Sequence, residues 1–87
     1  NHALALSPNN AYIYYDRASL HIANGDTGKA IEDYTRAIQI EPHLAEAFFN
    51  RGLLYFKLGD KKSATKDLSK AGELGLYDSY SIIKKMN

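Results

Sequence analysis

The sequence predicts an all-α fold built from helix-turn-helix units, and a 34-residue repeat is the main reason. Sliding the 87-residue chain by 34 positions superposes its second half on its first. The identical pairs are Ala11/Ala45, Arg17/Arg51, Leu20/Leu54, Gly25/Gly59, Asp26/Asp60, Ala30/Ala64, Asp33/Asp67 and Ala37/Ala71. A fixed period of this length is typical of stacked repeats, whose surface usually binds another molecule.

The second observation is helical spacing within each copy. Both copies place small residues and aromatic residues at i, i+4 and i+7, so that each set lies on one helical face. The sets are Tyr14, Ala18, His21 and Ala30, Tyr34, Ala37 in the first copy, and Phe48, Gly52, Tyr55 and Ala64, Leu68, Ala71 in the second. A bulky ring opposite Ala or Gly lets two antiparallel helices approach closely.

The third observation is the break inside each copy. Gly25-Asp26 and Gly59-Asp60 follow the expected first helices, 11–24 and 45–58. Glycine suits the left-handed residue at a helix C-terminus, and an acid suits the start of the next helix. Pro42 then separates the two units. Each copy is therefore predicted to be a helical hairpin.

These motif residues resemble the tetratricopeptide repeat, over essentially the whole chain. Two positions depart from the family pattern: Tyr or Phe stands for the usual tryptophan, and Arg17 or Arg51 for a usual leucine. The resemblance implies a right-handed α-α superhelix. It divides a single domain, residues 1–87, into repeats 11–44 and 45–78 followed by a capping helix 79–87.

Both ends extend the pattern. Ala3, Leu6 and Pro8 align with Ala37, Ile40 and Pro42, so residues 1–7 are expected to be the tail of a preceding repeat in a longer array. At the other end, Gly72, Gly75 and Asp78 predict a helix stop and a fresh N-cap. The capping helix would turn Ile82, Ile83 and Met86 toward the stack. The uncovered first end predicts self-association through residues 1–24.

Composition and residue placement argue against several function classes. The net charge of +1 disfavours nucleic acid and membrane contact by this segment, and the absence of cysteine leaves the compartment open. His2, His21 and His43 share no helical face, so no metal, cofactor or catalytic site is expected. His21, in the slot of Tyr55, is expected to be a packed, half-buried ring. The segment is not predicted to be an enzyme.

The two arginine slots have a structural explanation. Arg17 lies eight residues before Gly25, and Asp33 lies eight residues after it. Arg51 and Asp67 bracket Gly59 in the same way. Because such residues lie level across a hairpin, an ion pair within each hairpin is preferred to a basic ladder for phosphates.

The first helices carry a second apolar stripe beside the one that packs on their partners. A helix that is apolar on two faces either packs on two faces or exposes one to a ligand. The resemblance implies that the stripe lines a concave groove for a protein or peptide ligand, whereas packing between neighbouring first helices is the alternative. The expected groove residues are Tyr12, Tyr15, Ser19, Ile22, Phe49, Asn50, Leu53, Phe56, Tyr80 and Lys84.

A polar row runs through this stripe at the repeat spacing: Asp16, Asn50 and Lys84. Family members that bind chaperone C-termini use Asn and a basic residue at the last two slots, but Tyr15, Ser19 and Tyr80 replace the rest of that clamp. The sequence therefore favours a peptide-binding interaction module. A structural spacer or self-association segment, and a regulatory appendage of an enzyme outside this segment, are the alternatives.

Overall fold

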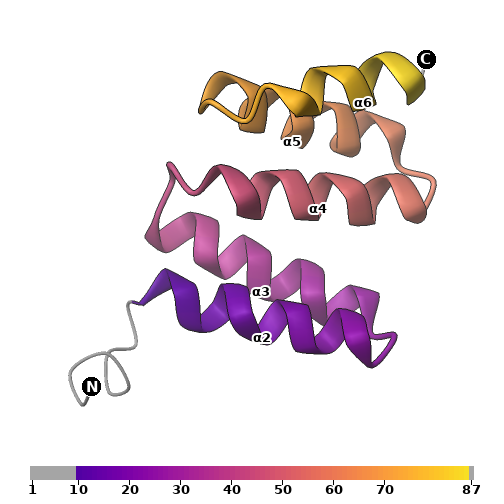
Figure 1. Ribbon diagram of the computed structural model, residues 1–87. Helices are drawn as coiled ribbons and strands as arrows, with labels where there is room; N and C mark the ends of the chain where they lie inside the picture. The colour runs from indigo at the N-terminus through magenta and orange to yellow at the C-terminus, as the bar shows by residue number, and fades with distance from the viewer. Residues whose placement is uncertain (1–9, 87) are drawn as a thin grey trace. The chain divides into compact units, whose positions relative to one another are not determined.

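The computed structural model describes residues 10–86, with the side chain of residue 86 left out, and they are helical apart from turns and short connections (Figure 1). The chain divides into two compact units, residues 1–42 and 43–87. The first unit contains α2 (Ala11–Ala23) and α3 (Thr27–Ile40). The second contains α4 (Ala45–Lys57), α5 (Lys61–Glu73) and α6 (Asp78–Met86). The predicted all-α, helix-turn-helix organisation is confirmed.

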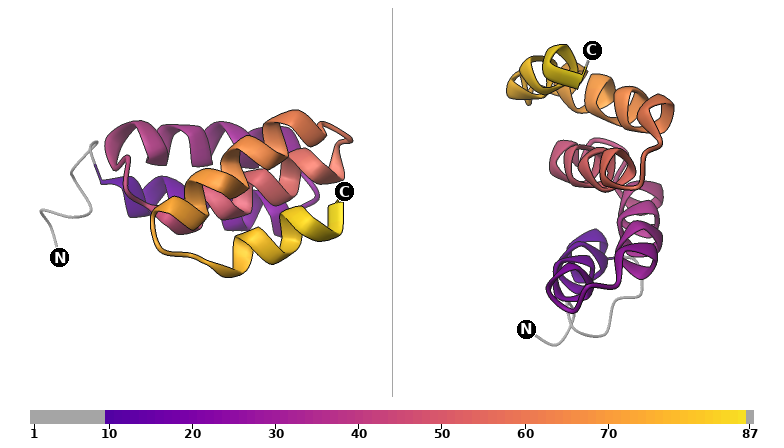
Figure 2. Two further views of the ribbon diagram at one scale, coloured as in Figure 1. Left: turned by 90° about the horizontal axis from the view of Figure 1, so that it is seen from above. Right: turned by 90° about the vertical axis from the view of Figure 1, so that its right-hand side faces the viewer.

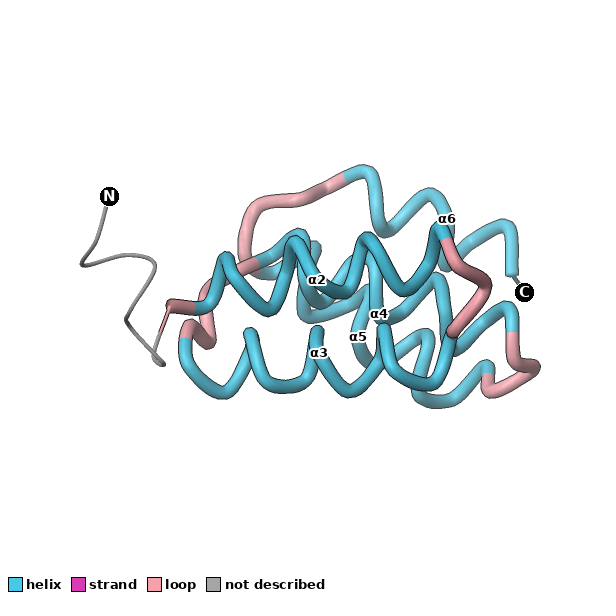
Figure 3. The backbone as a smooth tube through the Cα atoms, turned by 90° about the horizontal axis from the view of Figure 1, so that it is seen from below, coloured by secondary structure: helices cyan, strands magenta, loops and turns pink. Residues whose placement is uncertain are grey.

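Within each unit, consecutive helices run antiparallel and short loops join them (Figure 3). The two first helices end one residue earlier than predicted because Asn24 and Leu58 are their C-caps. The predicted tail, residues 1–7, lies outside the described residues, and the handedness of the superhelix and the division of the chain into repeats stay predictions. No described helix is both long enough and apolar enough to cross a membrane.

Both hairpin turns have the predicted glycine geometry. Gly25 and Gly59 have φ angles of 78° and 87°, in the left-handed region that favours glycine. The next residue in each turn donates its backbone N–H back to the helix, Asp26 to the His21 carbonyl at 2.8 Å and Asp60 to the Tyr55 carbonyl at 2.9 Å. These bonds complete a Schellman motif, which satisfies carbonyls left open at a helix end.

The same two aspartates begin the second helices. The Asp26 carboxylate accepts a hydrogen bond from the Lys29 backbone N–H at 3.3 Å, and the Asp60 carboxylate accepts one from the Ser63 N–H at 3.1 Å. Each therefore satisfies one of the N–H groups that lack an intrahelical partner. A single Gly-Asp pair thus ends one helix and starts the next, which explains why both copies contain it.

Small residues bring the hairpin helices together as predicted. Ala18, Ala30 and Ala37 are fully buried in the first hairpin, as are Ala64 and Ala71 in the second. At Gly52 the fit is tight: an added Cβ would lie 3.0 Å from Leu68 Cγ and 3.2 Å from the Ala64 carbonyl oxygen. A side chain there would need these neighbours to shift by a few tenths of an ångström.

The prediction for the last connection was partly wrong. Gly72 does not stop a helix; it lies buried inside α5, and Gly75, with φ 113°, is the left-handed residue that follows α5. α6 packs against α5 (Figure 2), and a Cβ on Gly72 would overlap the ring of Tyr80. Asp78 is the first residue of α6, not its N-cap. Gly72 is therefore a close-approach position, which local turn preferences do not reveal.

Candidate binding surfaces

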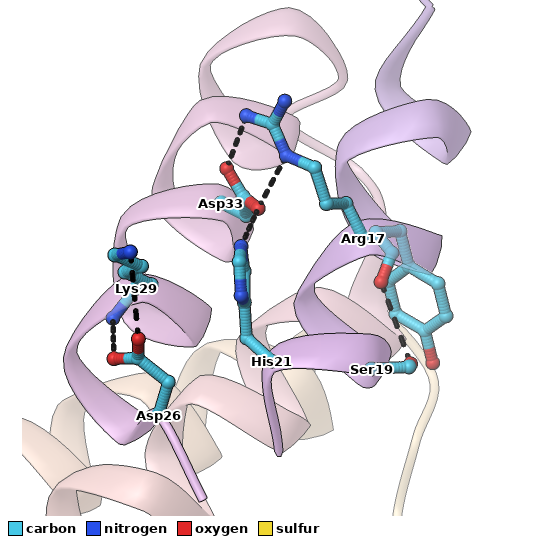
Figure 4. Close-up of polar contacts among 7 residues, drawn as sticks. Arg17, Ser19, His21, Asp26, Lys29 and Asp33 are labelled. Atoms are coloured by element: carbon cyan, nitrogen blue, oxygen red, sulfur yellow. Dashed lines mark hydrogen bonds and ion pairs between the residues drawn. The ribbon is translucent and has the colours of Figure 1, made fainter. Parts of the chain in front are cut away.

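The polar centre of the first hairpin is an ion pair between α2 and α3 (Figure 4). Arg17 Nε and Nη2 donate to the two carboxylate oxygens of Asp33 at 2.8 and 2.9 Å. The Arg17 side chain is half exposed, whereas that of Asp33 is only 8% exposed. The hydrogen bond from Arg17 lowers the pKa of Asp33 below its ordinary value, because it stabilises the charged carboxylate. The predicted ion pair is confirmed.

The second hairpin repeats this pair with greater burial. Arg51 Nε and Nη2 lie 2.6 and 2.8 Å from the carboxylate oxygens of Asp67. The Arg51 side chain is 16% exposed and that of Asp67 is 5% exposed. The Arg51 guanidinium also lies 5.8 Å from the Phe48 ring centre and 5.7 Å from that of Tyr55. Both arginines therefore hold their hairpins together and do not form a phosphate-binding ladder.

His21 adds a contact that the sequence analysis missed. Its side chain is 25% exposed, as expected for a half-buried ring, and its Nε2 lies 3.3 Å from Asp33 Oδ2 (Figure 4). His21 follows Arg17 by four residues, and this spacing places both on the same face of α2. That spacing was the signal for the contact. Among the described residues, no cluster of three potential metal ligands is present.

In the second unit, the predicted groove residues of α4 differ in burial. Phe49 and Leu53 are half-buried and pack on the buried pair Ala64 and Leu68 of α5. Phe56 is 42% exposed. The α4 stripe thus has a packed part and an exposed end, so packing accounts for two of its three apolar members.

The capping helix α6 packs on the same pair of α5 residues. Ile82 and Ile83 contact the Ala64–Leu68 pair, as predicted for the apolar side of this helix. Tyr80 lies over Gly72 but keeps 46% of its surface exposed. Lys84 is exposed, and Asn50 on α4 is half-buried. α4 and α6 therefore each combine apolar packing on α5 with an exposed aromatic ring.

In the first unit, the predicted groove residues of α2 also divide. Tyr12 and Ile22 are 59% and 40% exposed. Tyr15 is half-buried and meets the Tyr34 ring edge-on, with ring centres 5.5 Å apart. Ser19 is exposed, and its hydroxyl donates to the Tyr15 carbonyl at 3.4 Å, as Figure 4 shows. The role of these residues in ligand binding stays a prediction, and so does that of the polar row, which includes the exposed Asp16.

A cleft that the sequence analysis missed lies between α4 and α5. Its volume is about 460 Å³, and its walls combine an aromatic ring, the Arg51–Asp67 pair and lysines of α5. The lining residues are Phe48, Arg51, Lys66, Asp67, Ser69, Lys70 and Glu73. The available signal was the i, i+4 spacing of Lys66 and Lys70, which places two exposed cations side by side.

Models of one family match the chain in three places. A model described as TPR repeat matches residues 18–59, and two described as Tetratricopeptide repeat match residues 1–32 and 45–74. A search of curated protein sequences finds no match. Tetratricopeptide repeats generally bind other proteins and typically lack catalytic machinery. The matched segments together run from residue 1 to residue 74 and include both hairpins, and the chain therefore belongs to the tetratricopeptide repeat family.

Proposed function

We propose that this segment is a protein-protein interaction module that binds a peptide or helix on the apolar, aromatic surface of α4 and α6. The surface consists of Phe49, Leu53 and Phe56 on α4, and Tyr80 and Ile83 on α6. One observation carries the proposal: both helices pack on α5, yet each leaves a large aromatic ring more than two-fifths exposed. Phe56 lies at the end of α4 and Tyr80 at the start of α6. Exposed apolar surface on packed helices is typical of interaction sites.

The burial pattern supports a division of roles on this surface. Phe49, Leu53 and Ile83 are half-buried and form a floor that is held in place by α5. Phe56 and Tyr80 are more exposed and are free to lose further area to a ligand. Large aromatic rings on a rigid floor are the residues that most often dominate binding energy. Asn50 and Lys84 add polar groups on the same two helices, suited to a peptide backbone and a carboxylate.

The exposed apolar residues of α2 belong to the same proposal. Tyr12 and Ile22 expose apolar surface at the start and end of their helix. They would give the first unit a ligand-binding face of its own, with Tyr15 and Ser19 between them in sequence. The surface of the second unit carries the experiment, because its floor is defined by named contacts.

The test is a peptide selection followed by measured affinities. Peptides are selected on the 87-residue chain from a random phage-displayed library, and the dissociation constant of the best synthetic peptide is measured by fluorescence anisotropy. Phe56→Ala and Tyr80→Ala should each weaken binding at least about tenfold, the effect of losing an anchor worth about 1.4 kcal/mol or more. Tyr77→Ala is the matched control, because Tyr77 is 73% exposed and precedes α6.

The control should change the affinity less than about twofold, and circular dichroism should show equal helix content in all variants. A selected peptide that loses affinity equally in the Tyr77 variant would contradict the proposed surface. A library that yields no binder would favour the alternative of a structural spacer.

A further inference from the structure

The cleft between α4 and α5 lies outside the surface proposed above. Its lining includes the buried ring of Phe48 and the Arg51–Asp67 ion pair, in which the carboxylate of Asp67 is already neutralised. Lys66 and Lys70 of α5 form part of its wall. Lys66 makes no ion pair with a described residue, and Lys70 Nζ approaches Glu73 Oε1 only to 3.9 Å. The cleft therefore combines apolar surface with two weakly satisfied cations.

A comparison of the two repeats shows that charge distinguishes this cleft. The first hairpin has a corresponding cleft of about 340 Å³, lined by Ile31, Glu32, Thr35, Arg36 and Gln39. Lys66 and Lys70 occupy the slots of Glu32 and Arg36, 34 residues away in each case. A carboxylate in the wall of the first cleft is therefore replaced by a cation in the second.

The two lysines of the cleft wall belong to a longer row of lysines on α5. Lys62, Lys66 and Lys70 are all exposed and follow one another at intervals of four residues. Four residues of α-helix rise about 6 Å, so the three ammonium groups form a row on one face. In an extended peptide, alternate side chains point the same way at intervals of about 6.6 Å. Carboxylates on alternate residues of such a peptide therefore match the lysine row.

The positive charge of the chain is concentrated in the unit that carries these lysines. Residues 43–87 contain eight Lys and Arg against five Asp and Glu, a net charge of +3. Residues 1–42 contain three against five, a net charge of −2. An acidic ligand is therefore attracted to the second unit, where the lysine row lies. Electrostatic complementarity raises the association rate of such a ligand and fixes how it aligns with the row.

We propose that this cleft, with the lysine row, binds an acidic extended segment of a partner protein. Carboxylates on alternate residues of the segment pair with Lys62 and Lys66. An apolar side chain next in the series enters the cleft beside Lys70. The carboxylate of Glu73 in the cleft wall favours such a mixed ligand over a nucleic acid, whose every unit carries a phosphate.

The first experiment measures the charge requirement with a defined probe. It is a fluorescein-labelled nonapeptide in which glutamate alternates with serine and one leucine replaces the last glutamate. Lys66→Gln/Lys70→Gln should lower its affinity for the 87-residue chain at least about tenfold at low salt. Lys57→Gln/Lys85→Gln is the matched control, because it removes two exposed charges elsewhere in the second unit and should change the affinity less than about twofold.

The second experiment tests the cleft at constant charge. Ser69 lines the cleft between Lys66 and Lys70, so Ser69→Leu should fill part of it without changing a charge. The leucine peptide should bind wild type about fivefold more tightly than a peptide with serine in place of leucine, and Ser69→Leu should remove this advantage. The affinity of the serine peptide should stay within about twofold.

Four results would overturn the proposal. One is an equal loss of affinity in the Lys57/Lys85 control, which would indicate unspecific attraction. Another is an undiminished leucine advantage in Ser69→Leu. Binding of hexathymidylate as tightly as the peptide, through the same lysines, would assign the row to nucleic acid. Concentration-dependent association that Lys66→Gln/Lys70→Gln abolishes would assign it to a second copy of the chain. Because Phe56→Ala should leave this peptide unaffected, the result is independent of the function proposed above.

Discussion

Gly52 provides a direct test of how the hairpin helices pack, through its replacement by alanine and by leucine. It lies inside α4, where glycine is normally unfavourable compared with alanine. An alanine Cβ there would lie 3.0 Å from Leu68 Cγ and 3.2 Å from both the Ala64 carbonyl oxygen and Asp67 Cβ. Contacts between carbon atoms are most favourable at about 3.5–4.0 Å, so three neighbours would have to move.

The magnitude follows from two opposing effects. Replacing a helical glycine with alanine contributes up to about 1 kcal/mol of stability through helix propensity. Overpacking of a well-filled core costs about 1–3 kcal/mol, and the Ala64 carbonyl belongs to the backbone and yields little. Gly52→Ala should therefore lower the free energy of unfolding by about 1 kcal/mol. Gly52→Leu must also displace the fully buried Leu68 and should cost about 3 kcal/mol.

Gly28 is the matched control, because it is also helical but an added Cβ would meet nothing within 4 Å. Gly28→Ala should keep the propensity gain without crowding and raise the melting temperature. In a domain of this size, 1 kcal/mol corresponds to about 4–8 °C. Thermal melts followed by circular dichroism would measure all three variants. If Gly52→Ala raised the melting temperature as much as Gly28→Ala does, the close approach of α4 and α5 would be refuted.

Two further predictions concern the ion pair of the first hairpin and the aromatic stripe of α4. The pKa of Asp33 is lowered from its ordinary value of 3.8, so its contribution to stability is present above that pH and is lost as the pH falls through the lowered value. Denaturant titrations should therefore show that Asp33→Asn is about 1 kcal/mol less stable than wild type at pH 6. This difference in stability should shrink below pH 3.8. A difference that is the same at both pH values would contradict the Arg17–Asp33 ion pair. Phe49→Ala should cost about 2 kcal/mol, because the ring is half-buried on Ala64 and Leu68, whereas Phe56→Ala should cost less than about 1 kcal/mol. Equal losses in urea denaturation would show that exposure does not distinguish the two rings.

The two repeats use one framework with different surroundings. Both hairpins keep the Arg–Asp pair, the left-handed glycine and the acidic cap, because these features fix the turn and the helix register. The positions that differ lie around this framework. His21 contacts the pair in the first hairpin, where the second has Tyr55, and Lys70 replaces Arg36 beside the aromatic ring. Variation at such positions changes the surface without disturbing the hairpin.

Most of the hairpin architecture was predictable from the sequence, because its determinants are local or repeated. The Gly-Asp turns depend on neighbouring backbone groups, and the spacing of Arg17 and Asp33 about Gly25 is enough to place them level across a hairpin. The mistaken role of Gly72 has the opposite origin. It resembles a turn glycine in sequence, but contact with Tyr80 from the next helix determines its use.

The sequence by itself determined the hairpin helices, their Gly-Asp turns and the ion pairs, since each follows from short-range geometry that recurs every 34 residues. Only the tertiary structure decided which apolar residues remain available. Phe49 and Phe56 are the same residue type on the same apolar stripe of α4, yet Phe49 packs on α5 and Phe56 is exposed. The cleft beside Lys70 was likewise a tertiary outcome, because its walls come from two helices, α4 and α5.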